Sequence, residues 1–275
     1  MPDARPDAVP GDAVRGRDLL LAIDTATRTA VVAIGERDGG MVAEERWSSE
    51  HRHGAELLQH LDVLFARAGI TLDDVAAIVA GIGPGSFTGL RVGLATAKVI
   101  AYSARIPVVA VSSLEAIAYG ALASGASDAA GTDPSSTGDG GAPRVVVTLP
   151  AGTTDRYLAT VKRDAGGLPA IVRAPRLVAG VAPSRSSASV ASALADDPDA
   201  PPLVAIDLEG EAPAAASAAG RAALEQLAQG LLTIGAARLR AGATVDIAEL
   251  VPAYVALPRG VTDAASGMAW SPDLR

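Results

Sequence analysis

Short apolar runs separated by turn residues follow a polar start to the chain. Residues 19–23 form the first run, which ends at Asp24, and apolar residues return over 30–34 and over 41–47. Runs of this length joined by tight links are typical of strands that pair antiparallel with the next strand along the chain. The pattern therefore predicts a three-stranded meander.

Helical spacing then replaces these runs. Over residues 54–68 the apolar side chains recur on one helical face, at positions 57, 58, 61, 64, 65 and 68. Gly69 suits the C-terminal cap of such a helix. The pattern next predicts a buried strand, a helix without internal proline and another strand, over residues 76–82, 87–104 and 108–111. Ser112 and Glu115 have capping-box spacing, which predicts that Ser112 caps a further helix reaching about residue 123.

The order of elements repeats after a low-complexity segment, residues 124–143, which we expect to be a flexible linker. Beyond it the pattern predicts three strands, a helix, a strand and a long alanine-rich helix interrupted at Gly220 and Gly230, over residues 145–149, 157–162, 170–173, 187–195, 203–206 and 214–240. This shared order matches a duplicated ribonuclease-H-like unit, the two-lobed α/β plan of sugar kinases, Hsp70 and actin. Two unrelated α/β lobes are the alternative.

These elements divide the chain into five parts. We expect a disordered leader, an N-terminal lobe, the linker, a smaller C-terminal lobe and an irregular tail, over residues 1–17, 18–123, 124–143, 144–257 and 258–275. The leader has no apolar core of a signal peptide, and no apolar run reaches the roughly 18 residues that span a bilayer. The expectation is therefore a cytoplasmic protein with no membrane partner.

Composition limits the chemistry that the chain can carry. It contains no cysteine, which excludes disulfides, thiolate catalysis and cysteine-ligated metals. Its formal net charge is −8 and aromatic residues make up 3% of it. We expect such a chain to have neither a broad basic surface for phosphates nor aromatic side chains on which bases could stack. Another protein would therefore have to bind any RNA.

A glycine-rich segment, residues 81–91, links a predicted strand to a predicted helix. Such a junction presents free N–H groups and the positive end of a helix dipole, which suits an anion at Gly83, Gly85 and Ser86. The segment is neither a Walker loop nor a dinucleotide fingerprint, and its glycines fit a sharp turn equally well. Asp24 and Thr25 are further candidates for nucleotide contact, because kinase-like folds turn a hairpin at phosphates there.

Small residues recur every four positions along the helix over 87–104, at Gly89, Gly93, Ala97 and Ala101. Each glycine inside a soluble helix costs about 1 kcal/mol relative to alanine, which favours a close neighbour on this face. Leu90 and Leu94 lie beside the stripe. The neighbour is either the chain's own sheet or a helix of another chain, and the sequence leaves both interpretations open.

Three segments resemble the TsaB (YeaZ) family: LAIDTA at residues 21–26, HGAELL at 53–58 and, most specifically, GPGSFTGLRVG at 83–93. The resemblance covers residues 19–123 well and weakens beyond them. Where the family has an Asp-Ala-Arg-Arg-Gly-Glu-Val-Tyr-like segment, residues 149–157 read LPAGTTDRY. The resemblance implies the duplicated kinase-like fold and a place in tRNA threonylcarbamoyladenosine synthesis.

The resemblance also implies partners and a division of labour. TsaB proteins pair with TsaD, a related subunit that carries a metal and transfers threonylcarbamoyl to an adenosine beside the tRNA anticodon, and an ATPase, TsaE, joins them. TsaD-like proteins have a His-x-x-x-His metal pair whose positions here are Ser113 and Ile117, and isoleucine cannot coordinate a metal. We therefore expect no catalytic residue, metal ligand or intrinsic cofactor, ATP only at the level of the complex, and tRNA contact only through it.

The two helices over 54–68 and 87–104 are the expected interface with TsaD. The residues expected there are Glu56, Leu57, Leu58, Gly89, Leu90, Gly93, Leu94, Ala97 and Ala101. One alternative function is an ATP-binding kinase-like enzyme of the same fold, with Asp24 and Asp207 as the metal-binding carboxylates of the two lobes. Another is a self-contained homodimer that uses the same helix stripe.

Overall fold

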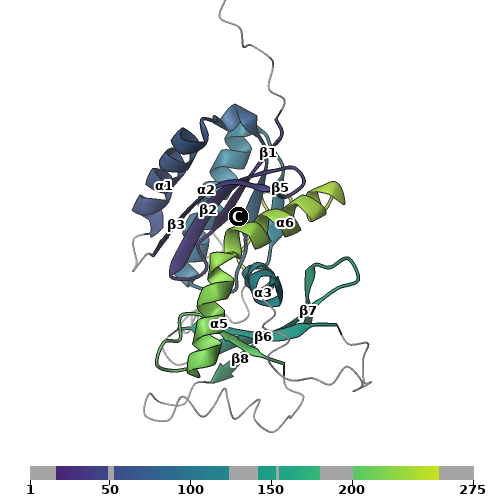
Figure 1. Ribbon diagram of the computed structural model, residues 1–275. Helices are drawn as coiled ribbons and strands as arrows, with labels where there is room; N and C mark the ends of the chain where they lie inside the picture. Colours follow the sequence, from purple (N-terminus) through teal and green to yellow (C-terminus); the bar gives the residue numbers. More distant parts are fainter. Residues whose placement is uncertain (1–16, 49–52, 124–141, 153–154, 180–200, 254–275) are drawn as a thin grey trace, which may run out of the picture.

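The computed structural model describes residues 17–48, 53–123, 142–152, 155–179 and 201–253. These residues form two mixed β-sheets with helices packed around and between them, so the protein is an α/β structure of two lobes (Figure 1). The predicted leader, most of the linker, the helix expected over 187–195 and the tail lie outside the described residues.

The first sheet has five strands, β1 (Leu19–Asp24), β2 (Thr29–Glu36), β3 (Met41–Ser48), β4 (Val75–Gly81) and β5 (Val108–Val111). Their order in the sheet is β3-β2-β1-β4-β5. The first three strands pair antiparallel, as predicted, and β4 then lies parallel to β1. This arrangement brings the C-terminal ends of β1, β4 and β5 to one edge of the sheet.

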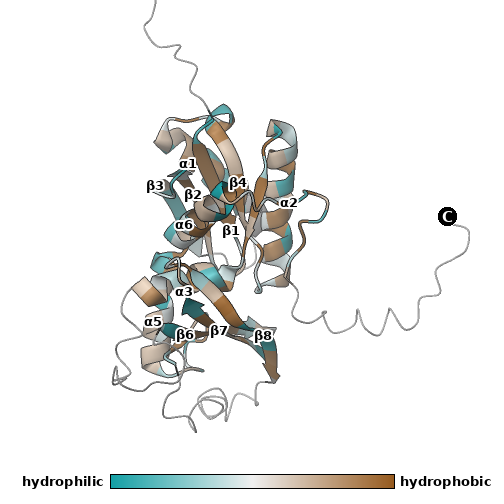
Figure 2. Ribbon diagram, turned by 90° about the vertical axis from the view of Figure 1, so that its right-hand side faces the viewer, coloured by the Kyte–Doolittle hydropathy of each residue, from teal (hydrophilic) through white to brown (hydrophobic). Residues whose placement is uncertain are grey.

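Helices cover both faces of this sheet. On one face, α1 (His53–Ala68) and α2 (Phe87–Ala104) pack on strand residues such as Ile23 and Ile78 and share a core cluster with them. A short 3-10 turn, η1 (Leu72–Asp74), leads into β4. On the other face lies α6 (Leu227–Arg240), which comes from the far end of the chain. Figure 2 shows hydrophobic colouring along the strands between these two helical layers.

The second sheet repeats the plan of the first. Its strands are β6 (Arg144–Ala151), β7 (Asp155–Arg163), β8 (Pro169–Ala179) and β9 (Leu203–Ala205), in the order β8-β7-β6-β9. Three strands again form an antiparallel meander and the fourth is parallel to the first. This shared topology confirms the duplicated ribonuclease-H-like fold.

Two helices join the lobes. Helix α3 (Ser113–Ala123) packs against β6, β7 and β8 and against α6, while α5 (Ala214–Glu225) packs on β9 and α3. One core cluster runs through both sheets, from Val79 and Val111 in the first, through Ile117 of α3, to Val147 in the second. Arg238 adds a polar link, because its guanidinium donates to the Ala110 carbonyl and to Glu115 of α3.

The structure departs from the sequence-based expectations at two elements. The predicted capping box of Ser112 and Glu115 is wrong. The Ser112 hydroxyl donates to the Gly83 carbonyl, and the Glu115 carboxylate pairs with Arg238. The long C-terminal helix breaks at Gln226, between α5 and α6, and not at Gly220 or Gly230. At Gly230 a Cβ would lie 2.5 Å from the Ala116 carbonyl oxygen, so this glycine permits close helix packing.

Candidate functional site

A buried polar cluster forms where β1, β4 and β5 end. Asp24 closes β1, Gly83 follows β4 and Ser113 begins the helix after β5. The Ser113 hydroxyl donates to Asp24 Oδ2 at 2.5 Å and accepts from the Gly83 N–H at 3.0 Å. Asp24 Oδ1 accepts from the Ala26 N–H at 2.7 Å. The cluster thus joins three strand ends through one carboxylate and one hydroxyl.

Burial dominates the electrostatics of Asp24. Its side chain is 1% exposed, and loss of hydration raises the pKa of this carboxyl above its ordinary value, while the bonds from Ser113 and Ala26 lower it in part. A Cβ at Gly81 would lie 2.0 Å from Asp24 Oδ2, so only glycine fits beside the carboxylate. Asp24 is therefore packed into the fold and bonded on both oxygens.

The glycine-rich segment folds directly onto the turn between β1 and β2. The Ser86 N–H donates to the Ala26 carbonyl at 2.7 Å, and the Ser86 hydroxyl accepts from the Gly89 N–H at 3.2 Å as the N-cap of α2. At Gly85 a Cβ would lie 2.1 Å from the Ala26 oxygen. Of the three residues that we considered for an anion, Gly83 and Ser86 donate their N–H groups to acceptors within the chain, and Gly85 lies against the Ala26 carbonyl.

The small-residue stripe of α2 faces the chain's own sheet, and this corrects the expected interface. Gly89, Leu90, Gly93, Leu94, Ala97 and Ala101 are all buried. The Thr25 hydroxyl donates to the Gly89 carbonyl at 2.7 Å, and a Cβ at Gly93 would lie 2.3 Å from the Thr25 oxygen. Leu57 of α1 is likewise fully buried. Close approach within one chain explains both helical glycines, so these residues cannot form an outward face.

The outward face of the two helices is made of other residues. Leu58, which the sequence did predict, is 58% exposed, while Glu56 is half-buried. In addition to Leu58, four apolar or aromatic side chains are exposed on α1 and α2: Val63, Phe87, Val99 and Tyr102. The Arg91 guanidinium stacks on the Phe87 ring at 3.8 Å from its centroid. A pattern in the sequence could have indicated this face. On a helix, Phe87, Val99 and Tyr102 fall on the side opposite the small-residue stripe.

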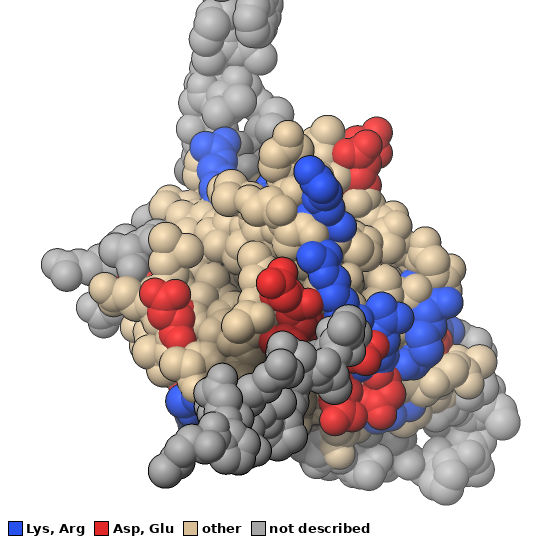
Figure 3. All heavy atoms as spheres, turned by 90° about the horizontal axis from the view of Figure 1, so that it is seen from above, with Lys and Arg blue, Asp and Glu red and all other residues tan. Residues whose placement is uncertain are grey.

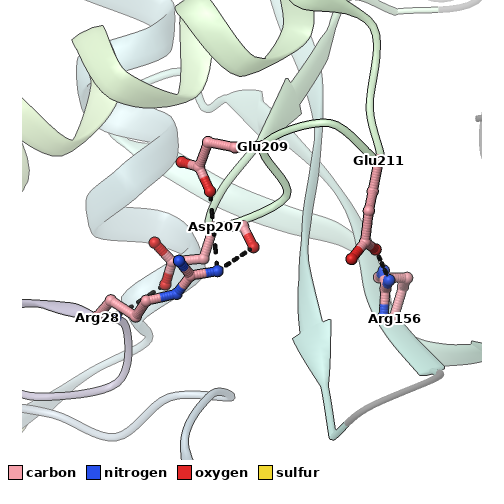
Figure 4. A network of polar contacts seen from close by, with 5 residues as sticks. All are labelled: Arg28, Arg156, Asp207, Glu209 and Glu211. Atoms are coloured by element: carbon pink, nitrogen blue, oxygen red, sulfur yellow. Dashed lines mark hydrogen bonds and ion pairs between the residues drawn. The ribbon is translucent and has the colours of Figure 1, made fainter. Parts of the chain in front are cut away.

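A second polar network connects the lobes (Figure 4). The Arg28 N–H, on the turn after β1, donates to Asp207 Oδ2 at 2.8 Å, and the Arg28 guanidinium donates to the Asp207 carbonyl at 2.9 Å. Glu209 forms a longer ion pair with the same guanidinium, at 3.8 Å. Burial raises the pKa of Asp207, and the Arg28 N–H and charge lower it in part.

The same loop is held from its other side by Arg156. Its guanidinium pairs with Glu211, and burial lowers the pKa of Arg156 while Asp155 raises it in part. Residues 207–211 are therefore fixed by one arginine from each lobe. Of the two carboxylates that the kinase-like alternative requires, Asp24 is bonded to Ser113 and Asp207 to Arg28.

The positions that match a metal-binding histidine pair do not suit a metal. Ser113 is bonded to Asp24, and Ile117 is fully buried in the core shared by the lobes. Among the described residues no group of three or more His, Cys, Asp or Glu side chains could hold a metal ion. In the same part of the chain, no helix is both long and apolar enough to cross a membrane.

Comparison with known proteins finds relatives of this chain. A family profile described as "TsaD: tRNA N6-adenosine threonylcarbamoyltransferase" matches residues 26–167, just over half of the chain. The Escherichia coli protein named "tRNA threonylcarbamoyladenosine biosynthesis protein TsaB" is 32% identical over 149 residues, which cover 54% of this chain and 57% of that protein. Its Haemophilus influenzae namesake is 38% identical over 103 residues, 38% of this chain and 43% of that protein.

The matches span about half the length of these curated relatives. Among solved structures, "YeaZ from Pseudomonas aeruginosa" superposes with a TM-score of 0.60 at 23% identity and covers 86% of this chain and 99% of its own. That likeness concerns the fold, which it extends over both lobes. Sequence and fold together show that the chain belongs to the TsaB (YeaZ) family.

Proposed function

We propose that this chain is the non-catalytic partner subunit of a complex that forms threonylcarbamoyladenosine beside the tRNA anticodon. In this proposal a TsaD-like subunit supplies the metal and the transfer chemistry, and a TsaE-like ATPase joins the complex. The chain itself contributes no metal, nucleotide or catalytic side chain, and ATP is used at the level of the complex. Two relatives that carry the TsaB name support the pathway.

Residue chemistry supports the non-catalytic part of the proposal. A metal would need ligands at positions 113 and 117, where the chain has a serine engaged with Asp24 and a buried isoleucine. The test is an assay of the isolated chain with threonylcarbamoyl-adenylate and unmodified tRNA. We expect no modified adenosine from this chain alone, and turnover in the absence of any TsaD-like protein would contradict the proposal.

The observation that carries the partner role is the apolar outward face of α1 and α2. Val99 is 65% exposed, Tyr102 78% and Leu58 58%. These three side chains of α1 and α2 leave apolar area in water that a partner's helices would cover. Burial of each leucine-sized side chain is worth about 1.5–3 kcal/mol, so a few of them suffice to hold two subunits together.

Charge insertion on this face tests the partner role. Val99→Glu combined with Tyr102→Glu should abolish co-purification with the organism's TsaD-like protein while the melting temperature stays within a few degrees of wild type. Val42→Glu on β3 is the matched control, because Val42 is 48% exposed on another surface. If the α2 variant still binds the TsaD-like protein, the assignment of this face to the partner is wrong. Measuring the oligomeric state of the chain alone shows whether the same residues form a homodimer instead of the heterodimer.

A further inference from the structure

Helix α2 differs from the rest of this acidic chain in its charge. The whole chain carries a formal net charge of −8, yet α2 contains no Asp or Glu. Its charged residues are Arg91 and Lys98, and Arg105 follows directly as the C-cap. The same helix carries the exposed side chains of Val99 and Tyr102, on which the proposed partner face depends. That face is therefore basic as well as apolar.

Helical spacing places the cations in a line beside these apolar side chains. Arg91, Lys98 and Arg105 are seven residues apart, which is close to two helical turns. Tyr102 lies four residues after Lys98 and three before Arg105, and side chains at these spacings are neighbours on a helix. Arg91, at the start of the line, stacks on the Phe87 ring. We call the other two cations, Lys98 and Arg105, the basic row.

Most other cations of the first lobe are neutralised within the chain. Arg37 pairs with Asp18, for example, and Arg67 with Glu45. Seen from above, several Lys and Arg side chains of this lobe lie next to Asp and Glu side chains (Figure 3). Within the described part of the chain, no carboxylate forms an ion pair with either residue of the basic row. The second residue of the row is exposed and the first is half-buried, so both charges are available to a partner.

A second copy of this chain is a poor partner for such a face. The exposed Asp62 of α1 is a single carboxylate against the two cations of the basic row, so the outward sides of α1 and α2 together remain basic. A two-fold dimer contact uses the same patch on both subunits. It would therefore bring two basic rows into one interface, and repulsion between like charges would weaken it.

Charges that flank an apolar contact act on partner choice and association rate more than on affinity. Exposed ion pairs contribute little to stability, whereas charged residues beside an apolar helical seam decide which helix can pair with it. Complementary charge also steers two proteins together, and salt screens that attraction. The apolar side chains of α1 and α2 would thus hold a partner, while the basic row would discriminate between candidate partners.

We propose that the basic row selects a partner helix that carries carboxylates, and so favours a TsaD-like subunit over a second copy of this chain. The inference rests on the proposed function for the identity of the partner and for the face that it covers. The partner's carboxylates lie beside its own apolar side chains, opposite Lys98 and Arg105. Charge complementarity speeds formation of the heterodimer, and like charge hinders formation of a homodimer.

Stopped-flow association of the full chain with the TsaD-like subunit, at increasing salt concentration, tests the proposal. The variant Lys98→Glu/Arg105→Glu should associate about tenfold more slowly than wild type at low salt, and the difference should shrink as salt rises. The control Arg173→Glu/Arg221→Glu makes the same charge change at exposed positions of β8 and α5 and should keep the wild-type rate. Equal association rates in the two variants would overturn the proposal, because only net charge would then matter.

Self-association of the chain is the second measurement. Sedimentation of wild type at increasing salt should show that any homodimer becomes more stable as salt screens the repulsion between the two basic rows. A homodimer that weakens as salt rises would overturn the selection against a second copy. Melting temperatures of both variants within a few degrees of wild type show that the changes leave the fold intact.

The outcomes separate this inference from the proposed function. If the charge-reversed variant associates at the wild-type rate while Val99→Glu/Tyr102→Glu fails to bind, the partner face stands and the basic row does not select. If the charge-reversed variant keeps its association rate but loses affinity for a tRNA transcript, the cations serve RNA and the inference fails. A wild-type chain whose self-association responds to salt as expected, but which does not bind the TsaD-like subunit, would keep the selection against a second copy and refute the proposed function.

Discussion

The backbone N–H of Arg28 donates to the carboxylate of Asp207, 179 residues further along the chain, and the Arg28 guanidinium donates to the carbonyl of the same residue. One arginine on the first turn of the N-terminal lobe thereby fixes the loop after β9 in the other lobe. Asp207 adopts a left-handed backbone conformation, with φ of 54°, so this contact also depends on a residue type that tolerates positive φ.

The loss of stability on replacing Asp207 should therefore depend on which residue takes its place. Asp207→Ala removes the acceptor of the Arg28 N–H and places alanine at positive φ, and we expect a loss of about 2–3 kcal/mol in the free energy of unfolding. Asp207→Asn keeps an acceptor oxygen and tolerates the backbone, so its loss should be under about 1 kcal/mol. Urea denaturation of both variants measures the difference. Equal losses would show that the hydrogen bond and the backbone conformation contribute little.

Asp24 should make stability depend on pH. Burial raises the folded-state pKa of Asp24 above its ordinary value of 3.8, so the folded state holds this proton more tightly than the unfolded state. The resulting stabilisation is present at low pH and is lost as pH rises from about 4 through the raised folded pKa. Asp24→Asn removes this titration and should flatten the fall in the free energy of unfolding over that window.

A series of urea titrations at several pH values checks the Asp24 prediction. Asp207, whose pKa is also raised by burial, contributes a decline of the same sign. Asp207→Asn therefore provides a comparison, and the double variant should be flatter than either single one. If Asp24→Asn follows the wild-type pH curve, the Asp24 carboxyl is not the source of the dependence.

A larger side chain at Gly93 should destabilise the isolated chain. A Cβ there would already lie 2.3 Å from the Thr25 oxygen, so Gly93→Leu forces α2 away from the end of β1. We expect a loss of about 3 kcal/mol, typical of severe overpacking, and a lower melting temperature. Ala95→Leu is the matched control, since Ala95 is exposed on the same helix. An unchanged melting temperature for Gly93→Leu would contradict the close approach of α2.

The Ser113 hydroxyl should matter for stability more than an exposed serine does. Ser113→Ala leaves the buried Gly83 N–H without its acceptor and removes the donor to Asp24. Leaving a buried polar group unpaired costs about 1–3 kcal/mol. Ser103→Ala, on the exposed side of α2, should change stability by less than about 0.5 kcal/mol. Similar effects of the two substitutions would argue against a structural role for the polar cluster.

Sequence patterns predicted the strands well where burial is one-sided or complete. The apolar runs located β1, β4 and β5 to within one residue, and the proline-free pattern gave both ends of α2. They missed most of β8, which extends to Ala179 although Pro175, Arg173 and Arg176 interrupt its apolar pattern. An edge strand tolerates proline and charge because one of its sides needs no partner strand.

The candidate site could be predicted only in part. The motif around Gly83 located the correct junction, but a spacing of four residues cannot say whether a glycine stripe meets its own sheet or another chain. Thr25 decides that question, because it lies against both Gly89 and Gly93. The Arg28–Asp207 contact joins residues that are distant in sequence, so no local pattern could have indicated it.

Helix α6 belongs by sequence to the second half of the chain but covers a face of the first sheet, with Leu231 and Leu232 in the same core cluster as Leu20 and Val31. A fragment that ended before the linker would leave that face of the sheet bare, and one that began after it would leave α6 without its support. Neither half is therefore an autonomous folding unit. The two lobes should melt in a single cooperative transition, even though their topology records a duplication.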